Sequence, residues 1–470
     1  MVISLVFLGW FSAFSVSEAW TSRFRNPRNS LLPAIKHAFV GFPISPLAAS
    51  LDDSDEAASG LPPLPTPTPW NDNKLEALLR LFDCLMVDEN GNPSAINRTL
   101  QDALDTVTNP LWTKDPARRT FWEPVAKGKQ SMNQFFLNWT KYTPTPDIAT
   151  KDPFVPNSPG YYIAHWDHLA STIPGRYLTI YSKPFKAWFV LFMYLQFEWL
   201  NSVNSNTTMT KWMNYQGSPE HPFNIMNFHV PVGGFKTFNQ FFLRHAKNRP
   251  IAGLGDASII VSPNDGGTFY LTKGHKKDVS YGLKGKSYDR FDVKDAFGEY
   301  GEKFVGGPLL DSLLWFTDYH YFFAPVSGKV VSVKDYPGSY NYDFEDFDPN
   351  DPYVEGPPNN SDEAGWYKRL PTHRRLNWII QTKDLGYVGM SAIGFWGVGS
   401  IENIIQENTY IEKGQYLGHF NYGGSSIVLA FEPNYDIDFG TITDGEIIPL
   451  QYADNPTLIE AGAQIGTLTN

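Results

Sequence analysis

The spacing of apolar positions divides the chain into a helical first part and a β-rich second part. From about residue 72 to 215, apolar residues recur at intervals of three and four, as in "NDNKLEALLRLFDCLMVDE", where Asn and Asp precede the run as an N-terminal cap. The stretch 187–201, "AWFVLFMYLQFEWLN", is apolar but contains Gln196 and Glu198 and is too short to cross a bilayer. It predicts a buried helix, with an interfacial membrane helix as the alternative.

Beyond about residue 250 the pattern changes to short β-favouring runs separated by Gly, Pro and Asp. These runs are "ASIIVSPNDGGTFYLT", "APVSGKVVSVKDYP", "NWIIQTKDLGYVGMSAIG" and "QYLGHFNYGGSSIVLAFEP". We therefore expect an α+β protein. A helical domain over 72–234 precedes a mostly antiparallel β domain over 235–470, which resembles a barrel or a sandwich in its strand pattern.

The N-terminus predicts a signal peptide over residues 1–19, because an apolar segment ends in Ser-Glu-Ala before Trp20. Residues 20–71 read as a linker that is first basic and then acidic and proline-rich. We expect the secretory pathway or an extracellular location, and the basic, acid-free start of the linker leaves an organelle leader as the alternative. Four glycosylation triplets agree with secretion: Asn97, Asn138, Asn206 and Asn359.

Composition narrows the class of protein further. The net charge of −11 and the lack of a basic stripe argue against a nucleic-acid partner. The single cysteine, Cys84, excludes an intramolecular disulfide and a cysteine-type zinc site, and its amphipathic surroundings predict a buried core residue. Ten histidines without clustered spacing give no support for a metal site.

Common catalytic signatures are absent from the sequence: there is no G-x-S-x-G elbow, no H-E-x-x-H and no phosphate-binding glycine loop. Three features of the β half remain: "SPNDGG" (262–267), "DYHYFFAPVSG" (318–328) and "GGSS" (423–426). Taken singly, each is an ordinary turn, core histidine or bulge. The glycine pair is the least ordinary, because glycine weakens a strand that is otherwise apolar.

Taken together, five motifs in order resemble the phosphatidylserine decarboxylase family of pyruvoyl-dependent enzymes over residues 235–435. They are "FKTFNQFFLRHAKNRPI", "VSPNDGG", "DYHYFFAPVSGKV", "VGSIE" and "EKGQYLGHFNYGGSSIVLAFE". The last is similar to the family's self-cleavage segment. The helical stretch before them resembles, more weakly, the additional N-terminal domain of fungal decarboxylases that act on free aromatic amino acids.

The resemblance implies that the chain cuts itself between Gly424 and Ser425. In the family, the serine hydroxyl attacks the preceding glycine carbonyl, and the serine becomes a pyruvoyl group at the start of a small chain, here 425–470. Glycine suits this position because it permits strained backbone angles and a close approach to its carbonyl. Decarboxylation of an amino acid leaves an electron pair that needs a sink, and the pyruvoyl carbonyl supplies one without an external cofactor.

Two further residues match the family's catalytic set. Asp265 matches the aspartate that assists the serine, and His320 matches the histidine used around the substrate carboxylate. The resemblance also places Tyr319, His320 and Ser426 beside the substrate. The family's second histidine, usually assigned to self-cleavage, falls on Phe323, which cannot accept a proton. Either another base such as His320 replaces it, strain and the oxyanion environment suffice, or the chain remains uncut.

These observations leave several functions open. The first is decarboxylation of phosphatidylserine to phosphatidylethanolamine, with possible peripheral membrane contact and a possible homodimer formed, as in the family, through the β domains. The second is decarboxylation of a free aromatic amino acid such as tryptophan. The third is an uncut protein that binds a lipid or another ligand without catalysis. A glycoside hydrolase with paired carboxylates fits the composition but explains none of the five motifs.

Overall fold

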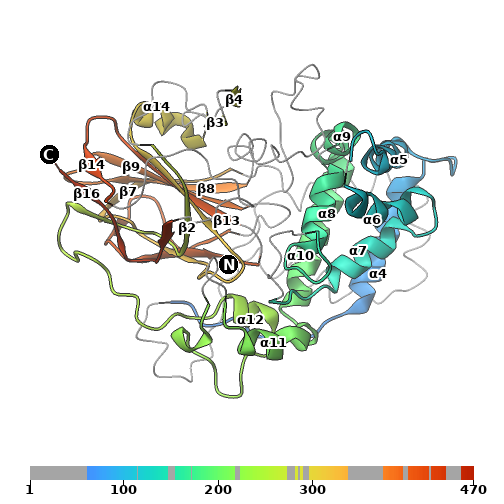
Figure 1. The fold of residues 1–470 in the computed structure, drawn as a ribbon, viewed down its shortest axis with the longest axis horizontal. Helices are drawn as coiled ribbons and strands as arrows, with labels where there is room; N and C mark the ends of the chain where they lie inside the picture. The colour runs from blue at the N-terminus through green and yellow to red at the C-terminus, as the bar shows by residue number, and fades with distance from the viewer. Residues whose placement is uncertain are drawn as a thin grey trace, which may run out of the picture.

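The computed structural model describes residues 61–113, 115–146, 154–170, 172–217, 223–272, 281–283, 286–288, 296–336, 374–394, 401–422, 425–440 and 457–469. The predicted signal peptide, most of the predicted linker and Gly424 lie outside these residues. Helices gather on one side of the molecule and strands on the other, with α11 and α12 along the bottom (Figure 1). The predicted α+β class is confirmed.

The first part consists of helices packed through large aromatic side chains. They are α4 (Asp72–Met86), α5 (Ala95–Thr108), α6 (Pro116–Ala126), α7 (Met132–Thr140), α8 (Tyr161–Ala170), α9 (Ile173–Tyr181), α10 (Lys183–Leu200), α11 (Met209–Asn214) and α12 (Phe238–Phe242). Asn71 caps α4 as predicted, since its side chain accepts from the Asn73 amide. In the core, the rings of Phe136 and Trp188 lie 4.6 Å apart.

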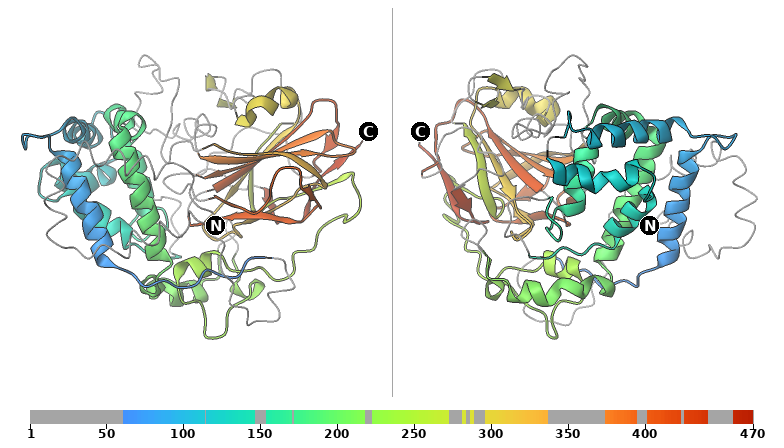
Figure 2. Two further views of the ribbon diagram at one scale, coloured as in Figure 1. Left: turned by 180° about the vertical axis from the view of Figure 1, so that it is seen from behind. Right: turned by 45° about the vertical axis from the view of Figure 1, so that its right-hand side comes forward.

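Helix α10 carries the apolar stretch whose burial was predicted. Trp188, Phe192 and Leu200 on it are all buried, so the prediction of a buried helix is confirmed. No helix among the described residues is long and apolar enough to span a membrane. Figure 2 shows α10 and α4 side by side in the helical half, and the two helices are in contact.

The prediction for Cys84 is wrong, because this thiol is exposed. The buried stripe of α4 consists of Leu75, Leu78, Leu79 and Phe82, which follow the three-four spacing of one helix face. A residue two positions after Phe82 is turned by about 200° around the helix axis. Cys84 therefore points away from the core.

The second part is built from antiparallel strands. In the part of the chain that the structure describes, its main sheet has eight strands in the order β11-β7-β8-β9-β13-β5-β2-β15. Two three-stranded sheets have the orders β10-β12-β6 and β1-β16-β14, and β3 pairs with β4. The bounds are β1 (Ile259–Val261), β2 (Gly266–Thr272), β3 (Tyr281–Leu283), β4 (Lys286–Tyr288), β5 (Leu309–Leu314), β6 (Tyr321–Phe323), β7 (Gly328–Tyr336), β8 (Arg375–Gln381), β9 (Tyr387–Gly394), β10 (Ile401–Asn403), β11 (Tyr410–Ile411), β12 (Tyr416–Phe420), β13 (Ser425–Phe431), β14 (Ile437–Asp438), β15 (Thr457–Ile459) and β16 (Gln464–Leu468).

The main sheet is covered on both faces. On its inner face, Trp378 packs 5.3 Å from Phe322 of the small β10-β12-β6 sheet. On its outer face, Phe297 and α14 (Gly301–Phe304) cover the strands, so closely that a Cβ added at Gly389 would lie 2.8 Å from the Phe297 ring. The described strands thus pack as a sandwich of sheets.

The small β10-β12-β6 sheet connects the two halves of the molecule. Phe322 and Phe420 on one of its faces belong to the core inside the sandwich. Tyr321 and Tyr416 on the other face belong to the core of the helical half. The segment between β5 and β6, which includes the predicted His320, therefore lies where the two cores meet.

Candidate active site

The register of β13 places Ser425 at one end of the main sheet. Ser425 is the first residue of β13 and pairs with Leu314, the last residue of β5, and with Gly394, the last residue of β9. The chain leaves β5 at Leu314 and reaches His320 six residues later, directly before β6. The end of the sheet that carries Ser425 is therefore also the end from which the His320 segment departs.

The loop that carries Asp265 lies at the same end of the sheet, because it directly precedes β2, the other neighbour of β5. Gly267 of β2 pairs with Leu313, and Asp265 precedes Gly267 by two residues. Asn264 in this loop accepts a hydrogen bond at 2.9 Å from the Ser312 hydroxyl of β5. The pairing of β13, β5 and β2 thus gathers all three predicted catalytic residues, although 160 residues of sequence separate the first from the last.

Ser425 has the properties of a buried nucleophile. Its side chain is 1% exposed, and its Oγ has no hydrogen-bond partner among the described residues. A buried hydroxyl without a partner is costly, and such groups are found where the hydroxyl has a chemical role. Gly424, whose carbonyl the resemblance makes the target, lies outside the described residues.

His320 is fully buried and its tautomer follows from its hydrogen bond. Nδ1 lies 3.0 Å from the backbone oxygen of Asp318, which can only accept, so Nδ1 carries the proton. Burial, and after it the nearby Arg244, lower the pKa of His320 to about 3, so the ring is neutral. Nε2 is left as a buried acceptor without a partner among the described residues.

The segment before His320 is fixed by Arg244, which the sequence analysis did not single out. Arg244 is fully buried and donates from Nη2 to the backbone oxygens of Thr317 and, at 3.3 Å, of Asp318. The Asp318 carboxylate accepts from the amide of Trp315 at 2.7 Å, and burial raises the pKa of this carboxyl to about 7. The ring of Phe242 covers His320, with 4.0 Å between the ring centres.

Asp265 does not contact His320 but forms an ion pair with Arg249. Arg249 donates from Nη2 to Oδ2 at 2.7 Å, and the amide of Ala461 donates to Oδ1 at 2.8 Å. Burial raises the pKa of Asp265, while Arg249 opposes that shift. The hydrogen-bonded chain of aspartate, histidine and serine that the resemblance suggests is therefore not formed between Asp265, His320 and Ser425.

Phe323 lies beside the Asp265 loop, at the position of the family's second histidine. Its amide donates to the backbone oxygen of Pro263 at 2.8 Å. Its ring packs between Tyr319 and Tyr416, at 6.1 and 6.2 Å between ring centres. Tyr319 is buried and lies under the guanidinium of Arg249, 5.8 Å from ring centre to Cζ. Position 323 is thus part of an aromatic cluster and supplies no base.

Ser426 is turned away from Ser425 and binds a carboxyl group that the sequence analysis missed. Its hydroxyl donates to Oδ1 of Asp311 on β5, and both side chains are fully buried. Burial raises the pKa of Asp311 to about 7, opposed by the Ser426 hydrogen bond, and Oδ2 has no partner among the described residues. The available signal was a lone Asp within the apolar run "LLDSLL".

The residues present fit a prosthetic group made from Ser425. Such a group would use the Ser425 Oγ as the reacting hydroxyl and the Nε2 of His320 as an acceptor at the same end of the sheet, and neither atom has a hydrogen-bond partner in the described part of the chain. A metal ion has no such support, since no group of three or more His, Cys, Asp or Glu side chains is arranged to hold one among the described residues.

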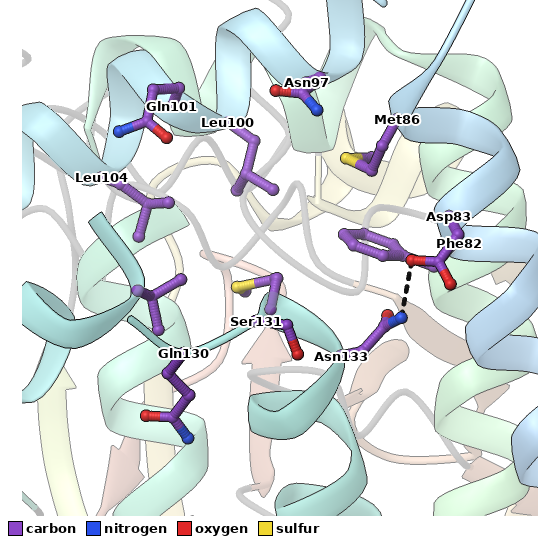
Figure 3. A pocket seen from close by; sticks show the side chains of 12 residues that line it. Phe82, Asp83, Met86, Asn97, Leu100, Gln101, Leu104, Gln130, Ser131 and Asn133 are labelled. Carbon is purple, nitrogen blue, oxygen red and sulfur yellow. Dashed lines mark hydrogen bonds between the residues drawn. The ribbon is translucent and has the colours of Figure 1, made fainter. Parts of the chain in front are cut away.

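A separate cavity of about 230 Å³ opens in the helical half (Figure 3). Its apolar floor includes Phe82, Leu100 and Leu104, and at its rim Asn133 donates to Asp83 at 2.7 Å. None of the predicted catalytic residues lines it.

Fold and site together define an α+β protein with a buried, unpartnered serine at the start of a central antiparallel strand. The family model described as phosphatidylserine decarboxylase matches residues 238–452. The phosphatidylserine decarboxylase proenzyme of Clostridium novyi is 30% identical over 249 residues, which cover 52% of this chain and 76% of that protein. The chain belongs to the phosphatidylserine decarboxylase family.

Two further relatives show how far the similarity extends. Phosphatidylserine decarboxylase proenzyme 3 of Schizosaccharomyces pombe is 30% identical over 247 residues, covering 52% of this chain and 23% of that protein. An L-tryptophan decarboxylase of Psilocybe cyanescens is 26% identical over 233 residues, covering 46% of this chain and 51% of that protein. The chain thus spans about a quarter of the first and about half of the second. The family model begins at Phe238, so α4–α11 lie outside its match.

Proposed function

We propose that this protein is a pyruvoyl-dependent decarboxylase that converts phosphatidylserine to phosphatidylethanolamine after cutting itself between Gly424 and Ser425. The observation that carries the proposal is the buried Ser425 hydroxyl, which has no hydrogen-bond partner among the described residues and begins β13. Relatives named phosphatidylserine decarboxylase proenzymes support both the reaction and the uncut precursor.

Self-cleavage requires one hydroxyl and one water molecule. Oγ of Ser425 attacks the carbonyl carbon of Gly424, the C–N bond breaks as the ester forms, and the hydroxyl proton ends on the released amine. Loss of the Ser425 α-proton then expels the Gly424 carboxylate. Water replaces the nitrogen, which leaves as ammonia, and residue 425 becomes the pyruvoyl group.

We infer that His320 serves as the base for Ser425, since Phe323 cannot. The support is the tautomer: Nδ1–H is committed to the Asp318 carbonyl, so the lone pair of Nε2 remains available in a neutral ring. Arg244 holds the Thr317 and Asp318 carbonyls and thereby orients this imidazole.

Residues around Ser425 also suit the decarboxylation itself. The pyruvoyl carbonyl supplies a sink for the electron pair that departing CO2 leaves behind. His320 is fully buried beneath Phe242, and such surroundings exclude water from the reacting carboxylate. Tyr319 directly precedes His320 in this segment, and its ring centre lies 5.8 Å from Cζ of Arg249, whose guanidinium is paired with Asp265.

A surface loop favours a membrane lipid over a free amino acid as substrate. Met226, Val230 and Val232 are 70%, 41% and 94% exposed, and the ammonium groups of Lys236 and Lys247 lie on the backbone of the same loop. Exposed apolar side chains flanked by two lysine ammonium groups are suited to binding an anionic membrane surface.

The base of this loop lies at the candidate site, since the Phe228 ring is 6.3 Å from that of Tyr319. With this loop on a membrane and the acyl chains of phosphatidylserine in the bilayer, the serine headgroup of the lipid would lie close to Tyr319 and His320. A free aromatic amino acid remains the second candidate substrate, supported by the similarity to an L-tryptophan decarboxylase.

The test is an intact-mass spectrum of the purified full chain beside a Ser425→Ala variant. A 46-residue fragment, 425–470, with a pyruvoyl terminus and absent from the variant supports self-cleavage. Phosphatidylserine vesicles and tryptophan are then offered separately, and release of CO2 identifies the substrate class. A single uncut wild-type chain would overturn the decarboxylase and favour the non-catalytic binding protein.

We further propose that residues 1–19 direct the chain into the secretory pathway and that it pairs through its β domain. A shift in mass after endoglycosidase treatment of the protein from its own cells supports the first. A mass without carbohydrate and an N-terminus within 20–71 would favour the organelle leader. Light scattering at twice the mass of one chain supports the homodimer.

A further inference from the structure

Two adjacent serines raise the question of which one attacks. The proposed target of the Ser425 hydroxyl is the carbonyl of the preceding residue, Gly424, and the carbonyl of Ser425 precedes the hydroxyl of Ser426 in the same way along the sequence. Each is a serine preceded by a small residue, so composition does not choose between them. Successive side chains of a strand point to opposite faces, so only one of the two hydroxyls can face the candidate site.

Ser426 belongs to the outer face of the main sheet. In register it lies opposite Leu313 of β5 and Ile393 of β9, and these two residues pack with Phe304 in the outer core. On this face its hydroxyl donates to Oδ1 of Asp311, which is also fully buried. The hydroxyl of Ser426 is therefore occupied.

Ser425 belongs to the inner face. It lies opposite Leu314, and along β5 the next side chain on that face is Ser312, which donates to Asn264 beside Asp265. The Ser425 hydroxyl has no partner among the described residues. The free hydroxyl thus shares a face with the side chain that reaches the Asp265 loop.

We propose that Asp311 is a positioning residue that selects Ser425 over Ser426 as the nucleophile by holding the Ser426 hydroxyl on the opposite face. The inference rests on the proposed self-cleavage. A slip of β13 by one residue would exchange the faces of both serines. Such a slip would remove the hydroxyl from Asp311 and leave its buried carboxyl group without a side-chain donor, which opposes the slip.

The carboxyl group is suited to this role by its isolation. Asp311 is on the outer face with Val428 directly opposite it on β13, and Ser391 lies beyond Val428 on β9. Ser391 is bound to Asn377 at 2.7 Å, so its hydroxyl is already used. Ser426 is the side-chain donor to the Asp311 carboxyl group among the described contacts, and the backbone amide of Ser312 is a second donor. Loss of the Ser426 hydroxyl would leave the buried carboxyl group without a side-chain partner.

The test compares the position and the rate of the cut in Asp311→Ala, Asp311→Asn and the wild type, by intact mass of the full chain. We expect the wild type to give only the 425–470 fragment. Asp311→Ala should be cut at least tenfold more slowly or give a second fragment, 426–470, that is one residue shorter. Asp311→Asn keeps an oxygen for Ser426 and should cut within threefold of the wild-type rate.

Ser426→Ala is a second variant that tests the same contact if Asp311→Ala fails to fold. It removes the hydrogen-bond donor while leaving the Asp311 side chain in place. It should also slow the cut, and near-ultraviolet circular dichroism verifies the fold of each variant. A single cut at Ser425 with the wild-type rate in both Asp311→Ala and Ser426→Ala would overturn the role of Asp311. An uncut wild-type chain would instead overturn the proposed function, and the selection role with it, so the two failures are distinct.

Discussion

Arg249 and Asp265 form an ion pair, with 2.7 Å between Nη2 and Oδ2, and their side chains are only 17% and 13% exposed. The carboxylate that the family resemblance assigns to serine activation is therefore neutralised by an arginine rather than bound to a histidine. The histidine position beside the same loop is Phe323. The aspartate that the resemblance makes catalytic is thus bound to an arginine and not to the buried imidazole of His320.

Removal of Asp265 should destabilise the fold. Asp265→Ala leaves the largely buried Arg249 guanidinium with only the longer contact of 3.9 Å to the exposed Glu460, and we expect the free energy of unfolding to fall by about 3 kcal/mol. Urea titration measures this loss. The control is Asp256→Ala, which removes an exposed aspartate bound to the neighbouring Ser258 and should cost much less than Asp265→Ala. Equal losses in the two variants would contradict a structural role for the ion pair.

Restoring the family's second histidine should accelerate self-cleavage. Phe323→His puts a base beside the Asp265 loop, and a positioned base contributes about 100-fold or more, so a gain of at least about tenfold is expected. The rate is followed by intact mass after synthesis. Phe323→Leu is the matched control, because it removes the ring without adding a base. A rate in Phe323→His no higher than in Phe323→Leu would show that position 323 is too far from Ser425.

Loss of Nε2 at position 320 should abolish the cut. Asn in His320→Asn retains an N–H group for the Asp318 carbonyl but has no equivalent of Nε2, so the segment is held while the base is lost. We expect cleavage to slow by about 100-fold or more. His419→Asn is the control, since His419 is a buried histidine of β12 that is bound to the Tyr416 hydroxyl at 2.7 Å. Normal cutting by His320→Asn would exclude the imidazole as base.

Asp311 should make stability depend on pH. Its pKa rises from about 4 in the unfolded chain to about 7 in the fold because of burial. Between these values the folded chain holds more protons, so its free energy of unfolding falls as the pH rises from about 4 to about 7.

In a Ser425→Ala background, which keeps every chain uncut, Asp311→Asn should remove this component. Urea titrations at pH 4.5 and 7.5 are compared for the chains with and without this second substitution. The unfolding free energy of the chain that retains Asp311, minus that of the Asp311→Asn chain, should be smaller at pH 7.5. A difference that does not change with pH would mean that Asp311 does not titrate in this range.

The exposed loop should contribute to membrane binding. Val232→Asp puts a charge at the most exposed apolar position, and we expect binding to vesicles of phosphatidylcholine and phosphatidylserine to weaken about tenfold, as for loss of one buried valine. Co-sedimentation measures the bound fraction. Leu111→Asp, also highly exposed but in the helical half, should bind as the wild type does. Equal effects of the two substitutions would remove the support for a lipid substrate.

The sequence by itself determined the class of fold and much of the candidate site. Three-four spacing encodes the helices and their buried faces, and short apolar runs between turn residues encode the strands, because both depend on neighbours within a few positions. The motif order located Asp265, His320 and Ser425, and the pairing of β13, β5 and β2 gathers them at one end of the sheet. The prediction for Cys84 is wrong because a residue two positions after Phe82 lies about 200° further around the helix axis, on the exposed face of α4.

Only the tertiary structure decided which side chains are partners. Asp311 and Ser426 are 115 residues apart, and their hydrogen bond exists only because β5 and β13 pair in one register. Arg249 reaches Asp265 across a chain reversal, and the tautomer of His320 depends on a carbonyl held by Arg244. A pattern of residue types specifies which elements form, whereas a hydrogen-bond partner depends on where those elements meet in space.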